Sequence, residues 1–478
     1  MSFAGLTAAE AFISYINKCP SQFHSTAQIA SIFNAAGFSK ISERTNEFPV
    51  KPLTRAYFTR NQSSVIAYAV GGKWKPGNGF VIQGAHTDSP VLKLKPISKI
   101  TSSGYLQVGV ECYGGGLWAT WFDRDLSLAG RVLVEKADGT VVSELVHVKD
   151  PIVRIPNLAI HLNRNAGETF TWNKETELLP VLASQLKVAA TLIENGVAGA
   201  TAEPCAKAAA APKVGVHFED SHHSVLIDRV AAELGVSAKT IVDFELCLYD
   251  TQPAAITGLC KEFVSARGLD NQLMCFITAS ALVDASADAV LAESEQIFIT
   301  ALFDNEEVGS SSAMGAGSNM LQRTLMRLNG EIGYDAAVSR SILVSADMAH
   351  ALHPNYASKH ECNHRPLLHG GLVIKENANQ RYATNPTSTF HVTRLAKQLN
   401  IPTQQFAVRN DSACGSTIGP ILSSSCGLRT VDVGVPQWAM HSIRETCGTE
   451  DVDSAFRLLA ALFPAFGPLD ASLKIDDQ

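Results

Sequence analysis

The stretch IFITALFDNEEVGS (297–310) places two adjacent carboxylates, Glu306 and Glu307, shortly after the apolar run Ile297–Leu302. An uninterrupted apolar run of this length is typical of a strand buried on both faces of an open α/β sheet. Such sheets bind ligands at the carboxyl ends of their strands. A pair of acids in a turn is more often only hydrated, however. The interpretation as a functional site therefore depends on what the rest of the chain offers.

Three other apolar runs have the same design and end in a histidine or a carboxylate. They are FVIQGAHTDSP (80–90), SILVSADMAHA (341–351) and TVDVGVPQWAMHS (430–442). Helix-like segments lie between them, for example NQLMCFITASALVDA (271–285) and TSTFHVTRLAKQL (387–399). This alternation of strands and helices predicts an α/β fold with a mainly parallel sheet.

A different pattern follows the first of these runs. Apolar residues alternate with polar ones at Leu106, Val108 and Val110, and again in Arg131–Glu135 before the hairpin signal Asp138-Gly139. Alternation of period two is typical of half-buried strands, and an Asp-Gly pair favours a tight turn between two of them. This part of the chain is therefore predicted to be rich in β-structure.

The change of pattern suggests the domain organisation. We predict a discontinuous α/β domain made of residues 1–94 and 246–478, with a β-rich domain inserted as residues 95–245. Within the insertion, AGATAEPCAKAAAAPKVG (198–215) is rich in Ala and Pro and lacks a helical apolar face, which predicts a mobile loop without an assigned role.

Length and charge limit the classes of protein that fit. At 478 residues the chain is longer than one hydrophobic core normally serves, so two domains are expected. A net charge of −7 argues against nucleic acid as a partner, because phosphate binding needs a concentrated basic face. No window approaches the roughly 20 apolar residues of a membrane-spanning helix. We therefore expect neither a nucleic-acid nor a membrane partner.

The N-terminus and the cysteines point to a cytoplasmic protein. No basic region precedes the apolar part of the N-terminus, and Thr7 with Glu10 predicts a capping box at the start of a first helix. We interpret this segment as mature structure and not as a secretion signal. The ten cysteines are scattered without a CxxC pair, a pattern that favours reduced thiols over a disulfide framework.

Two short motifs can each be explained by a structural role or by a functional role. In His86-Thr87-Asp88, side chains two residues apart on a strand project to the same side, so Asp88 is placed to support the His86 ring while it binds a metal. A hydrogen-bonded histidine in a turn explains this motif equally well. Asp270 stands directly before an apolar helix, where it is either an N-cap or a carboxylate shared by two cations.

Six residues at the ends of predicted elements make a more specific set: His86, Asp270, Glu306, Glu307, Asp347 and His441. Two histidines and four acids match the needs of a two-metal hydrolase, in which each ion takes three ligands, one carboxylate is shared and one base remains. Successive side chains diverge at the end of a strand. We therefore expect Glu307 to bind a metal and Glu306 to take the proton of a bridging water.

Five segments resemble, in order and spacing, the signature segments of the aspartyl aminopeptidases, which are dizinc exopeptidases that form tetrahedral dodecamers. They are GAHTDSP (84–90), RGLDN (267–271), FDNEEVGS (303–310), SADMAHALHPNY (345–356) and AMHSIRE (439–445). The resemblance implies a dizinc peptidase catalytic domain with an inserted dimerisation domain. It also implies two Zn²⁺ per subunit, with Mn²⁺ or Co²⁺ as alternatives at an exchangeable site.

The resemblance further implies a role for each member of the set. One metal would be held by His86, Asp270 and Asp347, and the second by Asp270, Glu307 and His441. Glu306 would be the general base, and Asp88 would orient His86. In such families the peptide bond after the shared aspartate, here Asp270-Asn271, is often cis.

Three more residues are implied by two further segments. IPNLAIHL (155–162) resembles a segment whose histidine enters the neighbouring subunit's active site, so His161 would stabilise an oxyanion across a dimer interface. VIKENANQRYATN (373–385) resembles the segment that recognises the substrate, with Lys375 as the cation for an acidic side chain and Tyr382 beside it. From the residues alone, a partly buried structural histidine and a solvated surface lysine explain the same positions.

The remaining histidines and a Gly- and Ser-rich loop are less informative. RNDSACGSTIGP (409–420) has amides suited to holding a substrate backbone. His350, His353 and His360 follow Asp347, but the set of six already satisfies two ions, so we expect supporting or structural roles for them.

We therefore predict a cytoplasmic, homododecameric metallo-aminopeptidase that releases N-terminal Asp and Glu from peptides. One alternative keeps the chemistry but prefers neutral residues, as in vacuolar relatives, which typically carry an N-terminal propeptide. A second is a non-catalytic shell or cargo protein, which the presence of every site residue disfavours. A third is another dizinc amidohydrolase, with Lys375 or Arg409 reading a C-terminal carboxylate.

Overall fold

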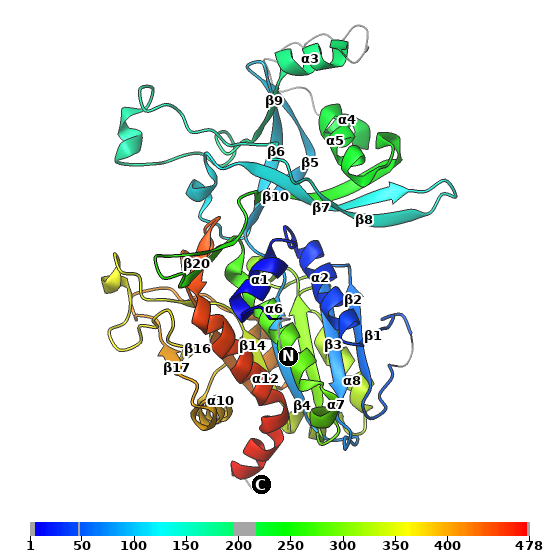
Figure 1. The fold of residues 1–478 in the computed structure, drawn as a ribbon, viewed down its shortest axis with the longest axis vertical. Helices are drawn as coiled ribbons and strands as arrows, with labels where there is room; N and C mark the ends of the chain where they lie inside the picture. Colours follow the sequence, from blue (N-terminus) through cyan, green and yellow to red (C-terminus); the bar gives the residue numbers. More distant parts are fainter. Residues whose placement is uncertain (1–4, 46–47, 195–216, 476–478) are drawn as a thin grey trace. The chain divides into compact units, whose positions relative to one another are not determined.

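The structure is a computed structural model that describes residues 5–45, 48–194 and 217–475 (Figure 1). The predicted loop at 198–215 lies outside these residues. The chain divides into two compact units. We call Met1–Ser89 together with Ala254–Gln478 the large unit, and Pro90–Pro253 the inserted unit.

The limits of the inserted unit differ from those expected from the sequence. Boundaries at residues 94 and 246 cut through β5 (Val91–Ser102) and β10 (Ile241–Asp250), which pair with each other. The register of β5 shifts between Leu94 and Lys99, so its alternating pattern becomes regular only after the strand has begun. Both strands belong wholly to the inserted unit.

A nine-stranded mixed sheet organises the large unit (Figure 1). Five of its eight strand pairs are parallel, which agrees with the mainly parallel sheet that the sequence predicts. The strands are, in spatial order, β1 (Ser39–Lys40), β2 (Arg55–Arg60), β3 (Ser64–Val70), β13 (Ile297–Phe303), β4 (Phe80–His86), β14 (Ile342–Ala346), β18 (Thr430–Gly434), β16 (Leu372–Lys375) and β17 (Thr403–Phe406).

Helices cover both faces of this sheet, as its uninterrupted apolar strands require. Along β3, Val65 and Ala67 belong to one hydrophobic cluster, and Ile66 and Tyr68 belong to the other. The first cluster includes residues of α1 (Ala8–Ile16), α2 (Gln22–Ala35), α6 (Leu269–Ala285), α10 (Pro386–Leu399) and α12 (Thr449–Ser472). The second includes residues of α8 (Met320–Asn329), α9 (Tyr334–Ser339) and α11 (Ile418–Cys426).

The first and last of these helices test two expectations. The predicted capping box at Thr7 and Glu10 is present at the start of α1. Helix α12, in contrast, is by length and composition apolar enough to cross a membrane, so the expectation that no segment reaches this limit was wrong. The helix is apolar because much of it is buried in the core of the large unit, where the ring of Phe463 lies 5.1 Å from that of Phe298 in β13.

The burial of Phe463 leads to a prediction about stability. Its side chain is fully buried, so Phe463→Ala is expected to lower the free energy of unfolding by roughly 3–5 kcal/mol through lost burial and a residual cavity. Urea denaturation measures the change. Leu259→Ala serves as the control because Leu259 is fully exposed. Equal effects of the two substitutions would contradict the assignment of α12 to the core.

The large unit also contains a small sheet of five strands. Its strands are β11 (Ala255–Thr257), β12 (Phe263–Ala266), β20 (Glu445–Gly448), β19 (Pro436–Trp438) and β15 (Ala349–His350). Strand β15 begins two residues after Asp347, and His441 lies between β19 and β20. The small sheet therefore fixes the chain on both sides of His441 and directly after Asp347.

The inserted unit is built on a six-stranded sheet in which every pair is antiparallel. The strands besides β5 and β10 are β6 (Tyr105–Tyr113), β7 (Leu126–Glu135), β8 (Val141–His147) and β9 (Val181–Ser184). The predicted alternation holds in β6, where Leu106, Val108 and Val110 are buried. The expected hairpin joins β7 to β8, with Gly139 at a positive φ of 82°.

Candidate metal centre

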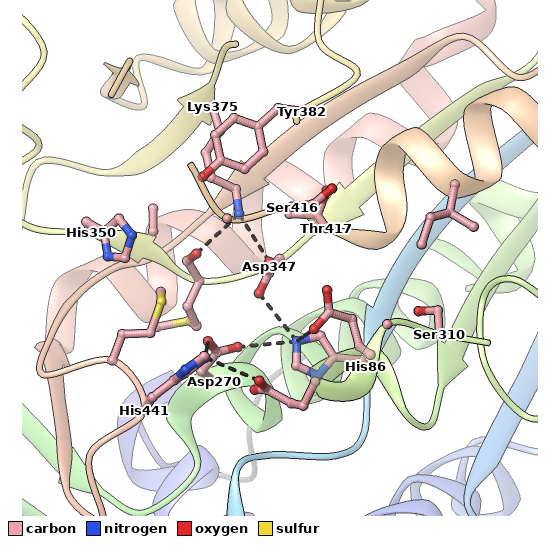
Figure 2. Close-up of a pocket in the computed structure, with 18 residues that line it drawn as sticks. His86, Asp270, Ser310, Asp347, His350, Lys375, Tyr382, Ser416, Thr417 and His441 are labelled. Atoms are coloured by element: carbon pink, nitrogen blue, oxygen red, sulfur yellow. Dashed lines mark hydrogen bonds and ion pairs between the residues drawn. The ribbon is translucent and has the colours of Figure 1, made fainter. Parts of the chain in front are cut away.

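The six residues of the predicted set line one pocket in the large unit, with a volume of about 330 Å³ (Figure 2). Three of the strands that reach it, β4, β13 and β14, are parallel neighbours, so their carboxyl ends meet at one edge of the sheet. His86 ends β4, and Asp347 follows the end of β14. The residues of the set lining the pocket are His86, Asp270, Glu306, Glu307, Asp347 and His441.

Asp270 lies between the two histidines. Its Oδ1 is 3.3 Å from His86 Nε2, and its Oδ2 is 3.4 Å from His441 Nε2. His86 Nε2 is also 3.5 Å from Asp347 Oδ1, and His441 Nε2 is 3.3 Å from Glu307 Oε2. Each carboxylate oxygen of Asp270 thus faces a different histidine, an arrangement suited to a shared ligand.

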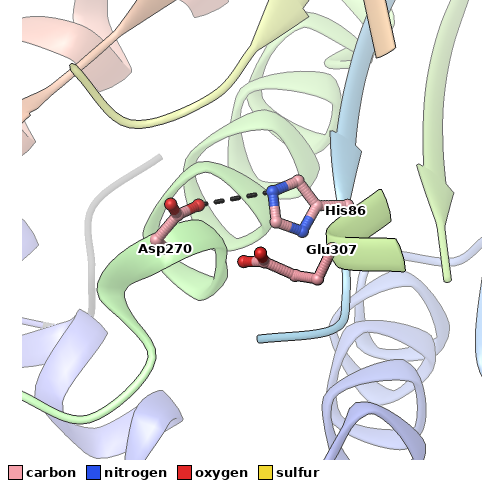
Figure 3. Close-up of side chains that lie close together, drawn as sticks. All are labelled: His86, Asp270 and Glu307. Carbon is pink, nitrogen blue, oxygen red and sulfur yellow. Dashed lines mark ion pairs between the residues drawn. The ribbon is translucent and has the colours of Figure 1, made fainter. Parts of the chain in front are cut away.

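Three side chains converge closely enough to hold one ion. Ligand atoms of His86, Asp270 and Glu307 lie within 4.8 Å of one another (Figure 3). Three buried carboxylate oxygens in this region, Asp270 Oδ1, Glu307 Oε1 and Asp347 Oδ1, accept no hydrogen bond from the described residues. A buried acceptor without a donor is costly unless a cation satisfies it. Imidazole nitrogens and carboxylate oxygens are ligands that zinc takes in proteins, so the residues fit this metal.

The charges of the clustered carboxylates also indicate a site for metal cations. Burial, together with the nearby carboxylates of Asp347 and Asp270, raises the pKa of the Glu306 carboxyl to about 7 against the attraction of His86. Burial likewise raises the pKa of Glu307, with Asp270 adding to the effect. Four carboxylates held this close repel one another, and bound divalent cations relieve that repulsion.

The sequence predicts that Glu306 and Glu307 stand at the end of a strand. In the structure, β13 ends at Phe303, and the two glutamates begin a 3₁₀ turn, Glu306–Val308, beyond it. Asn305, in the left-handed region at φ 63°, turns the chain. The carboxylate of Asp88 then accepts the backbone N–H groups of Glu306 and Glu307, both at 3.1 Å. The different directions of the two glutamates therefore come from a turn and not from strand alternation.

Asp88 also contacts His86, but in a different way from that expected. The hydrogen bond of His86 Nδ1 is to the main-chain oxygen of Asp88, at 3.0 Å, while the nearest carboxylate oxygen is 3.5 Å away. The carbonyl of Asp88 thus orients the ring, and its carboxylate mainly organises the turn that carries both glutamates.

Glu445 is a site residue that sequence reasoning missed. Its buried carboxylate accepts the backbone N–H of Asp270 at 2.9 Å and that of His441 at 2.7 Å. The peptide bond Asp270-Asn271 is cis, as the resemblance implies, and His441 has a positive φ of 67°. Glu445 therefore ties together the two unusual backbone segments that present Asp270 and His441. In the sequence, only the position of Glu445 at the end of the segment AMHSIRE indicated that it supports the site.

Removing one acceptor from Glu445 is expected to weaken metal binding. In Glu445→Gln an amide NH₂ faces one of two backbone N–H groups, so Asp270 or His441 loses its support. We expect zinc affinity to fall by roughly 10- to 100-fold, the usual effect of changing a group that orients metal ligands. Chelator competition measures the affinity. Asp451→Asn is the matched control, because Asp451 is an equally buried carboxylate that accepts two N–H groups away from the pocket.

Lys375 is a buried residue of the same pocket and not a solvated surface charge. Its Nζ donates to Met348 O at 3.2 Å, lies 3.4 Å from Asp347 Oδ2, and is 5.1 Å from the centre of the Tyr382 ring. Tyr382 and the loop residues Ser416 and Thr417 also line the pocket (Figure 2). The exposed Arg409 instead pairs with Asp411, so it is not placed like Lys375.

His161 lies in the inserted unit, in a segment, residues 156–165, in which every residue is exposed. Its apolar neighbours Leu158, Ile160 and Leu162 are 61%, 50% and 74% exposed. His161 is not among the residues that line the pocket of the large unit. The interpretation as a partly buried structural histidine is therefore wrong for the single chain.

The other histidines that the sequence singled out have different environments. His350 lines the pocket, with its ring at 5.6 Å from that of Phe406. The backbone N–H of His353 donates to His360 Nε2 at 3.1 Å. These contacts agree with supporting roles, and none of the three belongs to the group of metal-ligand atoms found among the described residues.

Two imidazoles and four carboxylates converge in one pocket at the edge of a mixed sheet, and three of the buried carboxylate oxygens accept no hydrogen bond from the described residues. This arrangement is that of a metallohydrolase. Comparison with known proteins narrows the class. The model of the peptidase M18 family, the aminopeptidase I zinc metalloproteases, matches residues 15–463. The chain belongs to this family, and it is an enzyme of the zinc metalloprotease type.

Three similar proteins cover nearly the whole chain. A probable aspartyl aminopeptidase from Ricinus communis is 47% identical over 99% of this chain and 98% of its own. The structure of the Ape4 and Nbr1 complex is 42% identical, covers 98% of this chain and 88% of that chain, and has a TM-score of 0.91. The chain in the structure of the S. cerevesiae mApe1 dodecamer is 27% identical to this chain. The match covers 98% of this chain and 99% of that chain, with a TM-score of 0.82.

Proposed function

We propose that this enzyme releases N-terminal Asp and Glu residues from peptides, using two zinc ions held in the pocket. The observation that carries the substrate assignment is the buried ammonium of Lys375, which lines the same pocket as the metal centre. A buried cation receives an acidic side chain favourably and a neutral side chain poorly. Relatives named aspartyl aminopeptidase support the same assignment.

The ligand assignment is the one that the family resemblance implies, and the distances between the side chains support a division of His86, Asp270 and Glu307 between two ions. His86, Asp270 and Asp347 would hold one ion, and Asp270, Glu307 and His441 the other, so Asp270 would be shared. Zinc ions held by these residues would polarise a carbonyl and lower the pKa of a bound water. The His and carboxylate mixture suits zinc, and Mn²⁺ or Co²⁺ are the alternatives at an exchangeable site.

Glu306 is the residue best placed to move a proton. It lines the pocket, it is assigned to neither ion, and its pKa of about 7 is close to that of an efficient general base. In the proposed reaction the Glu306 carboxylate accepts the proton of the attacking water and then gives it to the leaving amine. The free N-terminus of the substrate would approach one ion or its carboxylates, and this requirement would make the enzyme an exopeptidase.

The substrate's acidic side chain would point the other way, to Lys375, beside the ring of Tyr382. The Gly- and Ser-rich loop that lines the pocket, Gly415–Thr417, offers backbone amides near the substrate's main chain. The buried Lys375 disfavours a peptidase that prefers neutral residues. An apolar substrate side chain would cover the charge of Lys375 without pairing with it, which is costly.

The assembly is part of the proposal. We propose a homo-oligomer, with a dodecamer built from dimers as its form, in line with the solved dodecamer of a family member. The inserted unit would supply the dimer interface. His161 would enter the partner's pocket and stabilise the oxyanion, which accounts for an exposed segment with three exposed apolar side chains. We place the enzyme in the cytoplasm, with vacuolar delivery as the alternative.

Steady-state hydrolysis of matched anilides tests the proposed function. The purified protein is expected to cleave Asp- and Glu-anilides with a higher kcat/KM than Leu- and Lys-anilides, and to leave N-acetyl-Asp-anilide intact because its N-terminus is blocked. Preference for Leu would assign the enzyme to the neutral-specific type. Cleavage of the acetylated substrate would contradict an aminopeptidase.

A further inference from the structure

One buried carboxylate, Asp432 of β18, connects three segments that line the pocket. Its Oδ1 accepts a hydrogen bond from Thr417 Oγ1 at 2.6 Å, and its Oδ2 accepts one from Ala383 N at 2.7 Å. Lys375 is its cross-strand partner in the antiparallel pair of β16 and β18, so the two side chains project to the same face of the sheet. Asp432 itself is fully buried and does not line the pocket.

The residues around Asp432 leave space for its carboxylate and bind its backbone. A Cβ on Gly419 would lie 2.4 Å from Asp432 Oδ1, so the glycine allows the carboxylate to approach the start of α11. Thr417 Oγ1 also accepts the N–H of Gly419, at 3.2 Å. The backbone N–H of Asp432 donates to Thr384 Oγ1 at 2.8 Å. The loop before α11 and the turn after Tyr382 are therefore both anchored on one residue.

Asp432 also shapes the charge of the pocket. Burial raises its pKa, and the ammonium of Lys375 and the hydroxyl of Thr417 act against that rise. Lys375 thus interacts with two carboxylates, Asp347 and Asp432. Without the charge of Asp432, the ammonium of Lys375 would keep Asp347, whose Oδ2 lies 3.4 Å from its Nζ, as its ion-pair partner. Because the hydroxyl of Thr417 donates to Asp432, this hydroxyl is not offered to the side chain of a substrate.

We propose that Asp432 is a positioning residue for substrate selection. It holds Lys375, the turn at Tyr382 and Ala383, and Thr417 in the arrangement that receives the carboxylate of an acidic N-terminal side chain. It does so without touching the substrate. The inference rests on the proposed acidic specificity and adds the residue that maintains it.

The test compares Asp432→Asn with the unmodified enzyme on Asp- and Leu-anilides. The amide removes the charge, and its NH₂ group either opposes the N–H of Ala383 or makes the hydroxyl of Thr417 an acceptor in place of a donor. We expect the ratio of kcat/KM for Asp over Leu to fall by about tenfold, the scale of one lost buried hydrogen bond, and the fall to appear mainly as a higher KM for Asp. Zinc content and oligomeric state, measured on the same samples, are expected to stay at the unmodified values.

A control variant and two possible results distinguish a role of Asp432 in substrate selection from a general structural role. Asp451→Asn removes an equally buried carboxylate that accepts the N–H groups of His369 and Gly371, and it should leave the Asp/Leu ratio in place. An equal loss on both substrates in Asp432→Asn would mean a merely structural role and would overturn the inference. Absence of any preference for Asp in the unmodified enzyme would instead refute the proposed function.

A second pair of variants covers the case in which Asp432→Asn does not fold. Thr417→Val removes the hydroxyl that donates to Asp432 but keeps the shape of the side chain, and Thr417→Ser restores the hydroxyl. We expect the Asp/Leu ratio to fall in the valine variant and to recover in the serine variant. Equal ratios in the two variants would contradict the role of this hydrogen bond.

Discussion

Replacing Glu306 with glutamine is expected to lower kcat on Asp-anilide by roughly 10²- to 10⁴-fold, the usual contribution of a positioned general base. The amide keeps the shape of the side chain but cannot accept the proton of the attacking water. Because Glu306 is assigned to neither metal ion, zinc content is expected to stay near that of the unmodified enzyme. Stopped assays and elemental analysis of the same sample measure both quantities.

Glu307→Gln is the matched comparison, since the two residues are neighbours on the same turn. Glu307 contributes a ligand atom to the cluster with His86 and Asp270, so this variant is expected to lose both zinc and activity. If Glu306→Gln lost zinc and Glu307→Gln kept it, the roles assigned to the two glutamates would be reversed. If Glu306→Gln retained full activity, the base would have to be another residue.

Lys375→Met is expected to remove most of the preference for acidic substrates. The substitution keeps the length of the buried side chain but removes the charge that receives an acidic side chain. A hydrogen bond to a charged group contributes about 1.5–3 kcal/mol, so kcat/KM on Asp- and Glu-anilides should fall by roughly 10- to 150-fold. Leu-anilide should lose far less, because its side chain makes no ion pair with Lys375. Kinetics on the four anilides measure the change.

Arg381→Met provides the control for this prediction. Arg381 lies next to Tyr382 in the sequence but is exposed, with its Nε donating to Cys414 O at 3.1 Å. Its replacement is expected to preserve the preference for acidic residues. A loss of preference in Arg381→Met together with a normal preference in Lys375→Met would show that the exposed cation, and not the buried one, recognises the substrate.

The parts of the fold that the sequence predicts well are those governed by local pattern. Continuous apolar runs predict β4, β13, β14 and β18, since strands covered on both faces need apolar side chains throughout. Parallel strands present their carboxyl ends at one edge, so histidines and acids that follow them meet in space. Helix α12 shows the limit of composition, because a buried core helix is as apolar as a membrane span.

The parts that the sequence does not predict depend on contacts between distant residues. Glu445 binds the backbone of Asp270, 175 residues away along the chain, and Asp432 binds that of Ala383, 49 residues away. A buried carboxylate with backbone partners leaves no periodic signal in a sequence. The turn at Asn305 and the use of the Asp88 carboxylate were missed for the same reason, since both depend on the local backbone conformation.

Anomalous X-ray scattering at the zinc edge, measured on crystals of the zinc-loaded protein, tests the central claim most directly. We predict two peaks in the pocket, one among His86, Asp270 and Asp347, and one among Asp270, Glu307 and His441. Both peaks should be adjacent to Glu306 without contact to its carboxylate. A single peak, or strong peaks only elsewhere, for example near His353 and His360, would contradict the two-zinc centre.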